Sequence, residues 1–199
     1  LDSLIQVIDT VSKTINPEEI AIDMALESIW AIGNIATDSL QHRDLCLEKE
    51  VSQKVIFLLK NRKSLRDKLN RMAIWGLTRL VDMKPAPFWN QISDTLPFFI
   101  TIIEGSESSE EMIRYALWGI FYISNSFLLN IVDSGCIPLL VKFLDHSNLN
   151  LSFPTLKALG NIISSSRDSL TDEVLKNSGF LEKIFDIYSK AEEDVRIYA

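Results

Sequence analysis

The sequence of 199 residues contains few of the residues that build tight turns, disulfides or metal sites. Seven glycines and six prolines are too few for the frequent turns of a β-sandwich or a β-barrel. Two cysteines, Cys46 and Cys136, and two histidines, His42 and His146, stand without C-x-x-C or H-x-x-x-H spacing. We therefore expect free thiols, no metal and no cofactor.

Basic residues are outnumbered, because 20 Lys and Arg stand against 27 Asp and Glu, a formal net charge of −7. A negative chain without a Lys/Arg stripe is a poor match for a phosphate backbone, so we expect no direct nucleic-acid binding and favour a basic partner. The longest uninterrupted apolar runs, such as 137–141, are too short to cross a bilayer, and we expect no signal peptide. We expect a soluble intracellular protein that does not bind membranes.

Catalytic motifs are also missing from the sequence. It has no Ser/His/Asp or Cys/His set, no glycine-rich phosphate loop and no paired-carboxylate motif. The adjacent acids at 110–111 and 192–194 are typical of solvated helix starts, where the helix dipole favours negative charge. We therefore expect no enzyme and no catalytic residue.

A short motif, a bulky anchor followed by a small and then an apolar residue, recurs along the chain. The anchors are Trp30, Trp75, Trp118 and Lys157, spaced by 45, 43 and 39 residues. This period lies in or near the window of about 40–47 residues that is typical of helical armadillo and HEAT arrays.

Apolar or short residues recur six and two positions before each anchor and two and five positions after it. In the first segment these are Met24, Ser28, Ile32 and Ile35. Steps of four, four and three residues describe one face of an α-helix, so we expect this stripe to be buried in every repeat. The residue directly after each anchor is Ala or Gly, such as Gly76, which suits close helix packing.

A second apolar stretch precedes each long helix, and the turn signals around it predict three helices per repeat. The approximate repeats are 1–40 (partial), 41–85, 86–127, 128–167 and 168–199 (partial). Glycines at 135 and 179 mark helix ends. Val195 and Ala199 fit the stripe of a further long helix, so we expect an internal piece of a longer α-solenoid.

Each anchor shares a helix face with the residue four positions on. That face is not the buried stripe, so Trp30, Asn34 and Asp38, together with Trp75, should line an accessible groove. Indole walls would hold a Lys or Arg stem, a cation–π contact being worth ~0.5–2 kcal/mol. Asn can bind a peptide bond, and Asp can neutralise an ammonium. Periodicity alone leaves half-buried packing of the tryptophans equally open.

Four segments resemble central armadillo repeats of the importin-α family, the adapters of classical nuclear localisation signals. The segment 30–39 (WAIGNIATDS) resembles the third repeat, 71–80 with the proline-rich 84–89 the fourth, 118–124 the fifth, and 154–162 the sixth. The resemblance implies an all-α, right-handed armadillo-repeat solenoid that binds lysine/arginine-rich signal peptides in an extended conformation. It further implies importin-β binding through an N-terminal arm that these residues lack, and shuttling between cytoplasm and nucleus.

Site roles carry over where residues match. Three residues match the family's major signal-binding site. Trp30 matches the wall of a lysine slot, Asn34 the amide that holds the peptide backbone, and Asp38 the carboxylate that neutralises a lysine. The other peptide-binding residues implied by the resemblance are Trp75, Glu111, Trp118, Tyr122, Lys157 and Asn161.

Three residues depart from the family pattern. Arg79 stands in place of the clamp Asn of the fourth repeat, Met72 in place of a polar Asn, and Tyr115 in place of an Asp. Arg79 brings a cation into a groove for cations, which opposes lysine binding unless Glu111 or another acid pairs with it. We therefore expect a narrower or weaker major site.

An alternative function stays open at this point. An armadillo scaffold of the adhesion or membrane-tethering type would bind acidic or amphipathic partners without binding signal peptides. Basic stripes along the long helices would be expected there, and Arg79 and Lys157 are the candidates that this sequence offers.

Overall fold

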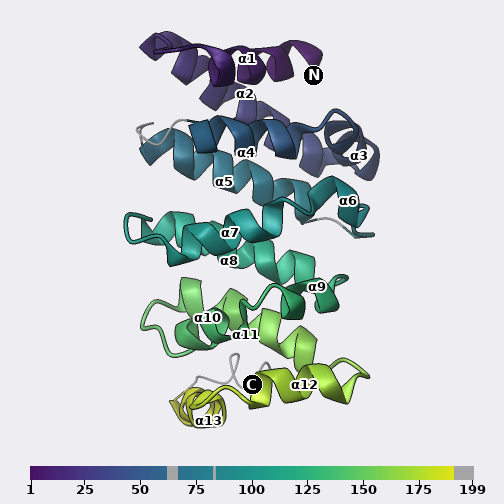
Figure 1. Cartoon of the computed structure of the whole chain (residues 1–199), viewed down its shortest axis with the longest axis vertical. Helices are drawn as coiled ribbons and strands as arrows, with labels where there is room; N and C mark the ends of the chain where they lie inside the picture. Colours follow the sequence, from purple (N-terminus) through teal and green to yellow (C-terminus); the bar gives the residue numbers. More distant parts are fainter. Residues whose placement is uncertain (62–66, 83, 191–199) are drawn as a thin grey trace. The chain divides into compact units, whose positions relative to one another are not determined.

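The computed structural model describes residues 1–61, 67–82 and 84–190, and every regular element in these ranges is a helix (Figure 1). The expected all-α class is therefore confirmed. The chain divides into two compact units, Leu1–Thr101 and Ile102–Ala199, which are described separately. The stripe positions Val195 and Ala199 and the acids at 192–194 lie outside the described residues.

Unit 1 is built around two long helices that pack along each other, α2 and α5 (Figure 1). Helices α1 and α3 also pack on α2, and α4 packs on α1 and α5. The helices of this unit are α1 (Asp2–Lys13), α2 (Glu19–Asp38), α3 (Leu40–Glu48), α4 (Val51–Asn61), α5 (Asp67–Val81), α6 (Trp89–Ile92) and the first part of α7 (Thr95–Glu104).

Unit 2 repeats this arrangement, with α8 packed along α11. Its helices after α7 are α8 (Glu110–Ser124), α9 (Leu128–Asp133), α10 (Ile137–Phe143), α11 (Leu149–Ile163), α12 (Asp168–Leu175) and α13 (Phe180–Lys190). Ser109 and Asn148 cap α8 and α11 with their side chains. Gly135 and Gly179, at φ of 72° and 82°, follow α9 and α12 and turn the chain where the sequence predicted helix ends.

The predicted apolar stripe forms the core of α5, α8 and α11, where every stripe residue is buried. On α2 the prediction was wrong at two positions, because Met24 is 52% exposed and Ile35 is only partly buried. Leu80, the α5 counterpart of Ile35, is buried and lines a small cavity together with Ile32 and Gly33 of α2.

Helix α2 is also long and apolar enough, by length and composition, to cross a bilayer. Uninterrupted apolar runs do not reveal this property, because Asp23 and Glu27 interrupt the apolar residues of α2. In the structure α2 packs along α1, α3 and α5, as the core helix of a helical repeat does. Its hydropathy is thus explained by packing within unit 1.

Two glycines allow α2 and α5 to approach closely. A Cβ atom at Gly76 would lie 2.8 Å from Cγ2 of Ile29, which is 2% exposed, and one at Gly33 would lie 2.5 Å from Cζ3 of Trp75. The small residue after the anchor therefore has the packing role at Gly76 that the sequence predicted.

The substitution Gly76→Ala should destabilise the protein by roughly 1 kcal/mol or more, since the overpacking of Ile29 exceeds the gain in helix propensity. The matched control is Gly160→Ala in α11, where a new Cβ would meet nothing within 4 Å. That change should stabilise by up to about 1 kcal/mol. Urea unfolding followed by circular dichroism measures both, and equal midpoints for the two variants would contradict the close packing.

Both cysteines are free, as the sequence predicted, and the structure buries both of them. Burial raises the pKa of the Cys46 thiol to about 11 and also raises the pKa of Cys136. Neither thiol is therefore an activated nucleophile at neutral pH. Within the described ranges, no group of His, Cys, Asp and Glu side chains could hold a metal ion.

Candidate functional site

Three of the predicted site residues lie at exposed positions of α2. Trp30 is 49% exposed, Asn34 is exposed one turn later, and Asp38 is the last residue of the helix. Oδ2 of Asp38 lies 2.9 Å from Nδ1 of His42 at the start of α3. An aromatic face, an amide and a carboxylate thus follow one another along one side of α2.

Trp75 is half-buried, which corresponds to the packing alternative that periodicity left open. Its indole lies directly on α2 at Gly33, where a Cβ would come within 2.9 Å of two ring carbons. Because Gly33 follows Trp30 by three residues, the ring packs on α2 next to the position of Trp30. Glycine is required here, since any larger residue would displace the indole.

The family departure Arg79 lies next to this indole on α5. Its Cζ is 5.9 Å from the centroid of the Trp75 ring, and its Nη1 is 3.0 Å from Oδ2 of Asp82. Its Nε is buried and has no hydrogen-bond partner among the residues that the structure describes. Met72, one turn before Trp75, is half-buried. The Trp75 ring therefore already has a cation of the same chain, the Arg79 guanidinium, next to it.

In unit 2, Glu111 is exposed in the first turn of α8 and forms a local cluster. Its Oε1 accepts a hydrogen bond from Tyr115 Oη at 3.0 Å and lies 3.5 Å from Nη2 of Arg114. The Arg114 guanidinium also stands 4.8 Å from the Tyr115 ring. Burial, the hydrogen bond to Glu111 and its negative charge raise the pKa of Tyr115. Tyr115, which stands in place of the family's Asp, is thus a neutral hydrogen-bond donor to Glu111.

Trp118 belongs to an aromatic cluster of α8 and α11. Its ring centroid lies 5.5 Å from Phe121, 5.7 Å from Tyr122 and 6.1 Å from Phe153. The Lys157 ammonium stands 5.5 Å from the Phe121 centroid and 5.0 Å from the Phe153 centroid. The fourth anchor therefore places its own cation on aromatic faces, as Arg79 does in unit 1.

Asn161 has its amide engaged within unit 2. Nδ2 donates to Ser124 Oγ at 2.8 Å and lies 3.4 Å from Asn125 Oδ1, both at the end of α8. This amide ties α11 to α8. A peptide that used Asn161 as a clamp would have to compete with Ser124.

Sequence reasoning missed four residues that shape the site: Gly33, Asp82, Phe121 and Phe153. Three of them stood at helix-neighbour spacing. Asp82 is three residues after Arg79, and Phe153 is four residues before Lys157. Phe121 likewise follows Trp118 by three residues. Gly33 gave no such signal, since its role depends on a ring from another helix.

Comparison with known proteins shows which sequences and structures the chain is similar to. Residues 129–164 match the family model described as Armadillo/beta-catenin-like repeat. Importin subunit alpha-1b of Oryza sativa subsp. japonica is 30% identical over 145 residues, which cover 71% of this chain and 26% of that protein. Importin subunit alpha-2 of Arabidopsis thaliana is 30% identical over 129 residues, covering 63% and 23%. The chain thus spans about a quarter of the length of these curated relatives.

Solved structures agree on the fold. A designed armadillo repeat protein, YIII(Dq.V1)4CPAF in complex with peptide (KR)4, aligns over 99% of this chain and 79% of its own with a TM-score of 0.77 and 18% identity. A second design, YIII(Dq)4CqI, aligns over 98% and 78% with a TM-score of 0.76 and 15% identity. At these identities the likeness concerns the fold alone. The chain is therefore an all-α armadillo-repeat solenoid, and its sequence is similar to that of importin α subunits.

Proposed function

We propose that this chain is the peptide-binding part of a nuclear-import adapter. It binds a lysine- or arginine-rich nuclear localisation signal, in an extended conformation, against α2. The observation that carries the proposal is the exposed row of Trp30, Asn34 and Asp38. The net charge of −7 supports a basic ligand, and the importin α relatives support an armadillo peptide-binding scaffold.

Each member of the row has a task in this proposal. The Trp30 indole packs on the aliphatic stem of a lysine and attracts its ammonium. The Asn34 amide both donates to and accepts from one peptide bond of the ligand. The Asp38 carboxylate offsets the ammonium charge, and its contact with His42 holds it in place. Trp75, seated on Gly33, is the wall on the α5 side.

Unit 2 contributes a second contact region in the same proposal. Trp118 and Tyr122 present ring surface, and Glu111 supplies negative charge. Lys157 and Asn161 act on the chain's own groups, holding the aromatic cluster and the end of α8. For the whole protein we propose binding to importin β through an arm outside these residues, and movement between cytoplasm and nucleus.

Fluorescence anisotropy with labelled peptides of equal length tests the proposal. One peptide is lysine-rich, one has every lysine replaced by glutamate, and one has every lysine replaced by alanine. The lysine peptide should bind in preference to both others, with an affinity that falls as salt is raised. Preference for the glutamate peptide would overturn the proposal and favour the adhesion or tethering scaffold, in which Arg79 and Lys157 would face acidic partners.

Removing the Arg79 cation should strengthen binding of the lysine-rich peptide. Arg79→Asn takes a positive charge away from the Trp75 ring and frees Asp82 to face the ligand. We expect affinity to rise by roughly three- to tenfold, the effect of about 1 kcal/mol. Arg79→Lys keeps the charge and is the matched control, which should leave affinity unchanged. An Asn variant that binds no more tightly than the wild type would contradict the role of Arg79.

A further inference from the structure

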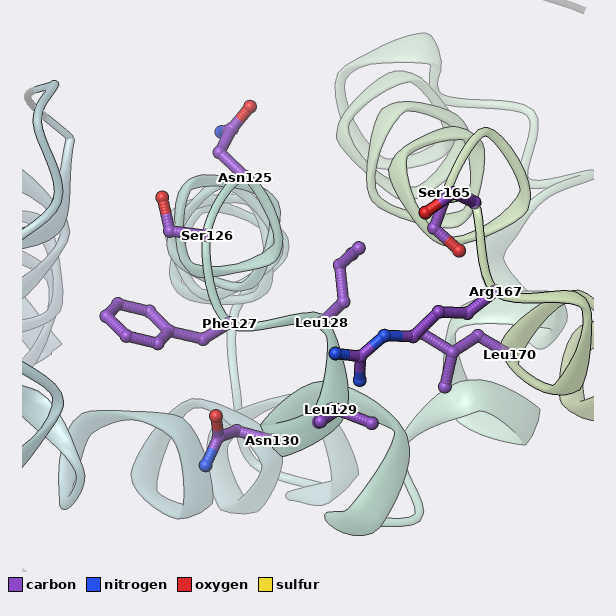
Figure 2. A pocket seen from close by; sticks show the side chains of 10 residues that line it. Asn125, Ser126, Phe127, Leu128, Leu129, Asn130, Ser165, Arg167 and Leu170 are labelled. Carbon is purple, nitrogen blue, oxygen red and sulfur yellow. The ribbon is translucent and has the colours of Figure 1, made fainter.

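A pocket of about 380 Å³ lies between two turns of unit 2 and has no part in the proposed groove (Figure 2). One wall is the turn from the end of α8 into α9, and the other is the turn from the end of α11 into α12. We call it the turn pocket. Its volume is within the range of about 300–1,000 Å³ that is typical of ligand sites. Trp118, Tyr122 and Lys157 do not line it.

Among the residues that the structure describes, Arg167 is the only one with a charged side chain that lines the turn pocket. Figure 2 shows it extending from the α11–α12 turn toward α9, with its guanidinium drawn between Leu128 and Leu129. Within the described part of the chain, this guanidinium has no carboxylate or other hydrogen-bond partner. Its adjacent acid, Asp168, starts α12 and makes no ion pair with it.

The other arginines with described contacts behave differently. Arg43 pairs with Asp44, Arg79 with Asp82, and Arg114 with Glu111. In a chain with more acids than bases, an arginine that faces a pocket without an acid has five donors available for a ligand. A planar guanidinium binds a carboxylate with two parallel hydrogen bonds.

The walls of the turn pocket add apolar surface and uncommitted polar groups. Leu170 is buried, and Leu129 is 45% exposed, so one leucine supports the pocket and the other offers contact area. The amide of Asn130 has no side-chain partner in the described ranges. Oγ of Ser165 is buried there and likewise unpaired, and it can gain a bond by rotation about χ1.

We propose that the turn pocket binds a peptide whose acidic residue is flanked by leucine-like residues, with Arg167 pairing the carboxylate. The flanking apolar side chains pack on Leu128 and Leu129, and Asn130 bonds the peptide backbone. A single carboxylate suits the site better than a polyphosphate, because the net charge of −7 repels polyanions. None of the residues that we propose to contact the signal peptide lines this pocket.

The test uses two labelled peptides, Ser-Leu-Glu-Leu-Ser and the same peptide with Gln in place of Glu. The wild-type chain should bind the Glu peptide about tenfold more tightly than the Gln peptide, as a charge-assisted bidentate pair predicts. Arg167→Gln should abolish this difference. Arg167→Lys should retain part of it, because lysine keeps the positive charge but cannot form the two parallel hydrogen bonds of a guanidinium. Arg114→Gln, an arginine of the same unit outside the turn pocket, is the control and should keep the full difference.

Several outcomes would overturn the proposal. These are equal binding of the two peptides, no binding of either, or a preference that survives Arg167→Gln. Competition by millimolar inorganic phosphate as effective as that by the Glu peptide would reduce the site to a simple anion site and also overturn it. Binding of the lysine-rich peptide should be unchanged in Arg167→Gln, which separates this test from that of the proposed function.

Discussion

Replacing Trp30 with alanine should lower the affinity of the chain for a lysine-rich peptide by roughly tenfold or more. The indole is 49% exposed, so it offers a broad rigid surface for a lysine stem and an electron-rich face for its ammonium. Truncation of a central aromatic contact typically costs about 2 kcal/mol or more, and each 1.4 kcal/mol is a factor of ten. Fluorescence anisotropy with the lysine-rich peptide measures the change.

The matched control is Phe57→Ala on α4. Phe57 is also 49% exposed, so the variant removes a comparable aromatic surface outside the row of Trp30, Asn34 and Asp38. Its affinity for the peptide should stay within about twofold of the wild type, because a surface change away from a site has little effect on it. If both variants lost affinity equally, or if neither did, the α2 row would not be the binding surface.

The largest loss of stability is expected for Arg43→Met. This arginine is 2% exposed, and its Nε and Nη2 donate to Oδ1 of Asp44 at 2.9 and 2.7 Å. Its Nη1 donates to the carbonyl oxygen of Pro85 at 2.6 Å, which fixes α3 to the proline-rich segment after α5. Methionine fills much of the volume but leaves these acceptors without their donor, so we expect a loss of about 2–4 kcal/mol.

Urea unfolding followed by tryptophan fluorescence measures this loss, since Trp30, Trp75 and Trp89 all lie in unit 1. Arg114→Met is the control. Arg114 is 35% exposed at its ion pair with Glu111, and a surface ion pair contributes about 0–1 kcal/mol. A midpoint for Arg43→Met as high as that of the control would show that the buried guanidinium is not a main support of unit 1.

The sequence period predicted faces of helices better than it predicted contacts between side chains. Leu69, Ala73, Leu77 and Leu80 are buried as the stripe required, because a helix with one apolar face must cover it. Met24 broke the rule, since burial of that position depends on a neighbouring helix and not on its own periodicity. The helix period is a local property, whereas burial is a property of the assembled repeats.

In the candidate site, too, helix spacing predicted exposure but not contacts between helices. Exposure of Trp30, Asn34 and Asp38 followed from their spacing, because residues four apart share a side of a helix. Spacing could not tell that Asn161 would bond to Ser124, since that contact joins α11 to α8. Such pairings depend on the register between helices, which is set by packing at contacts like that of Gly76 with Ile29.

The packing of the Trp75 ring on Gly33 affects how the proposed peptide-binding surface can change by mutation. A Cβ atom at Gly33 would overlap the Trp75 ring, so one added carbon atom there would displace the ring from its present position on α2. Ligand preference could then drift through a mutation at a residue that never meets the ligand.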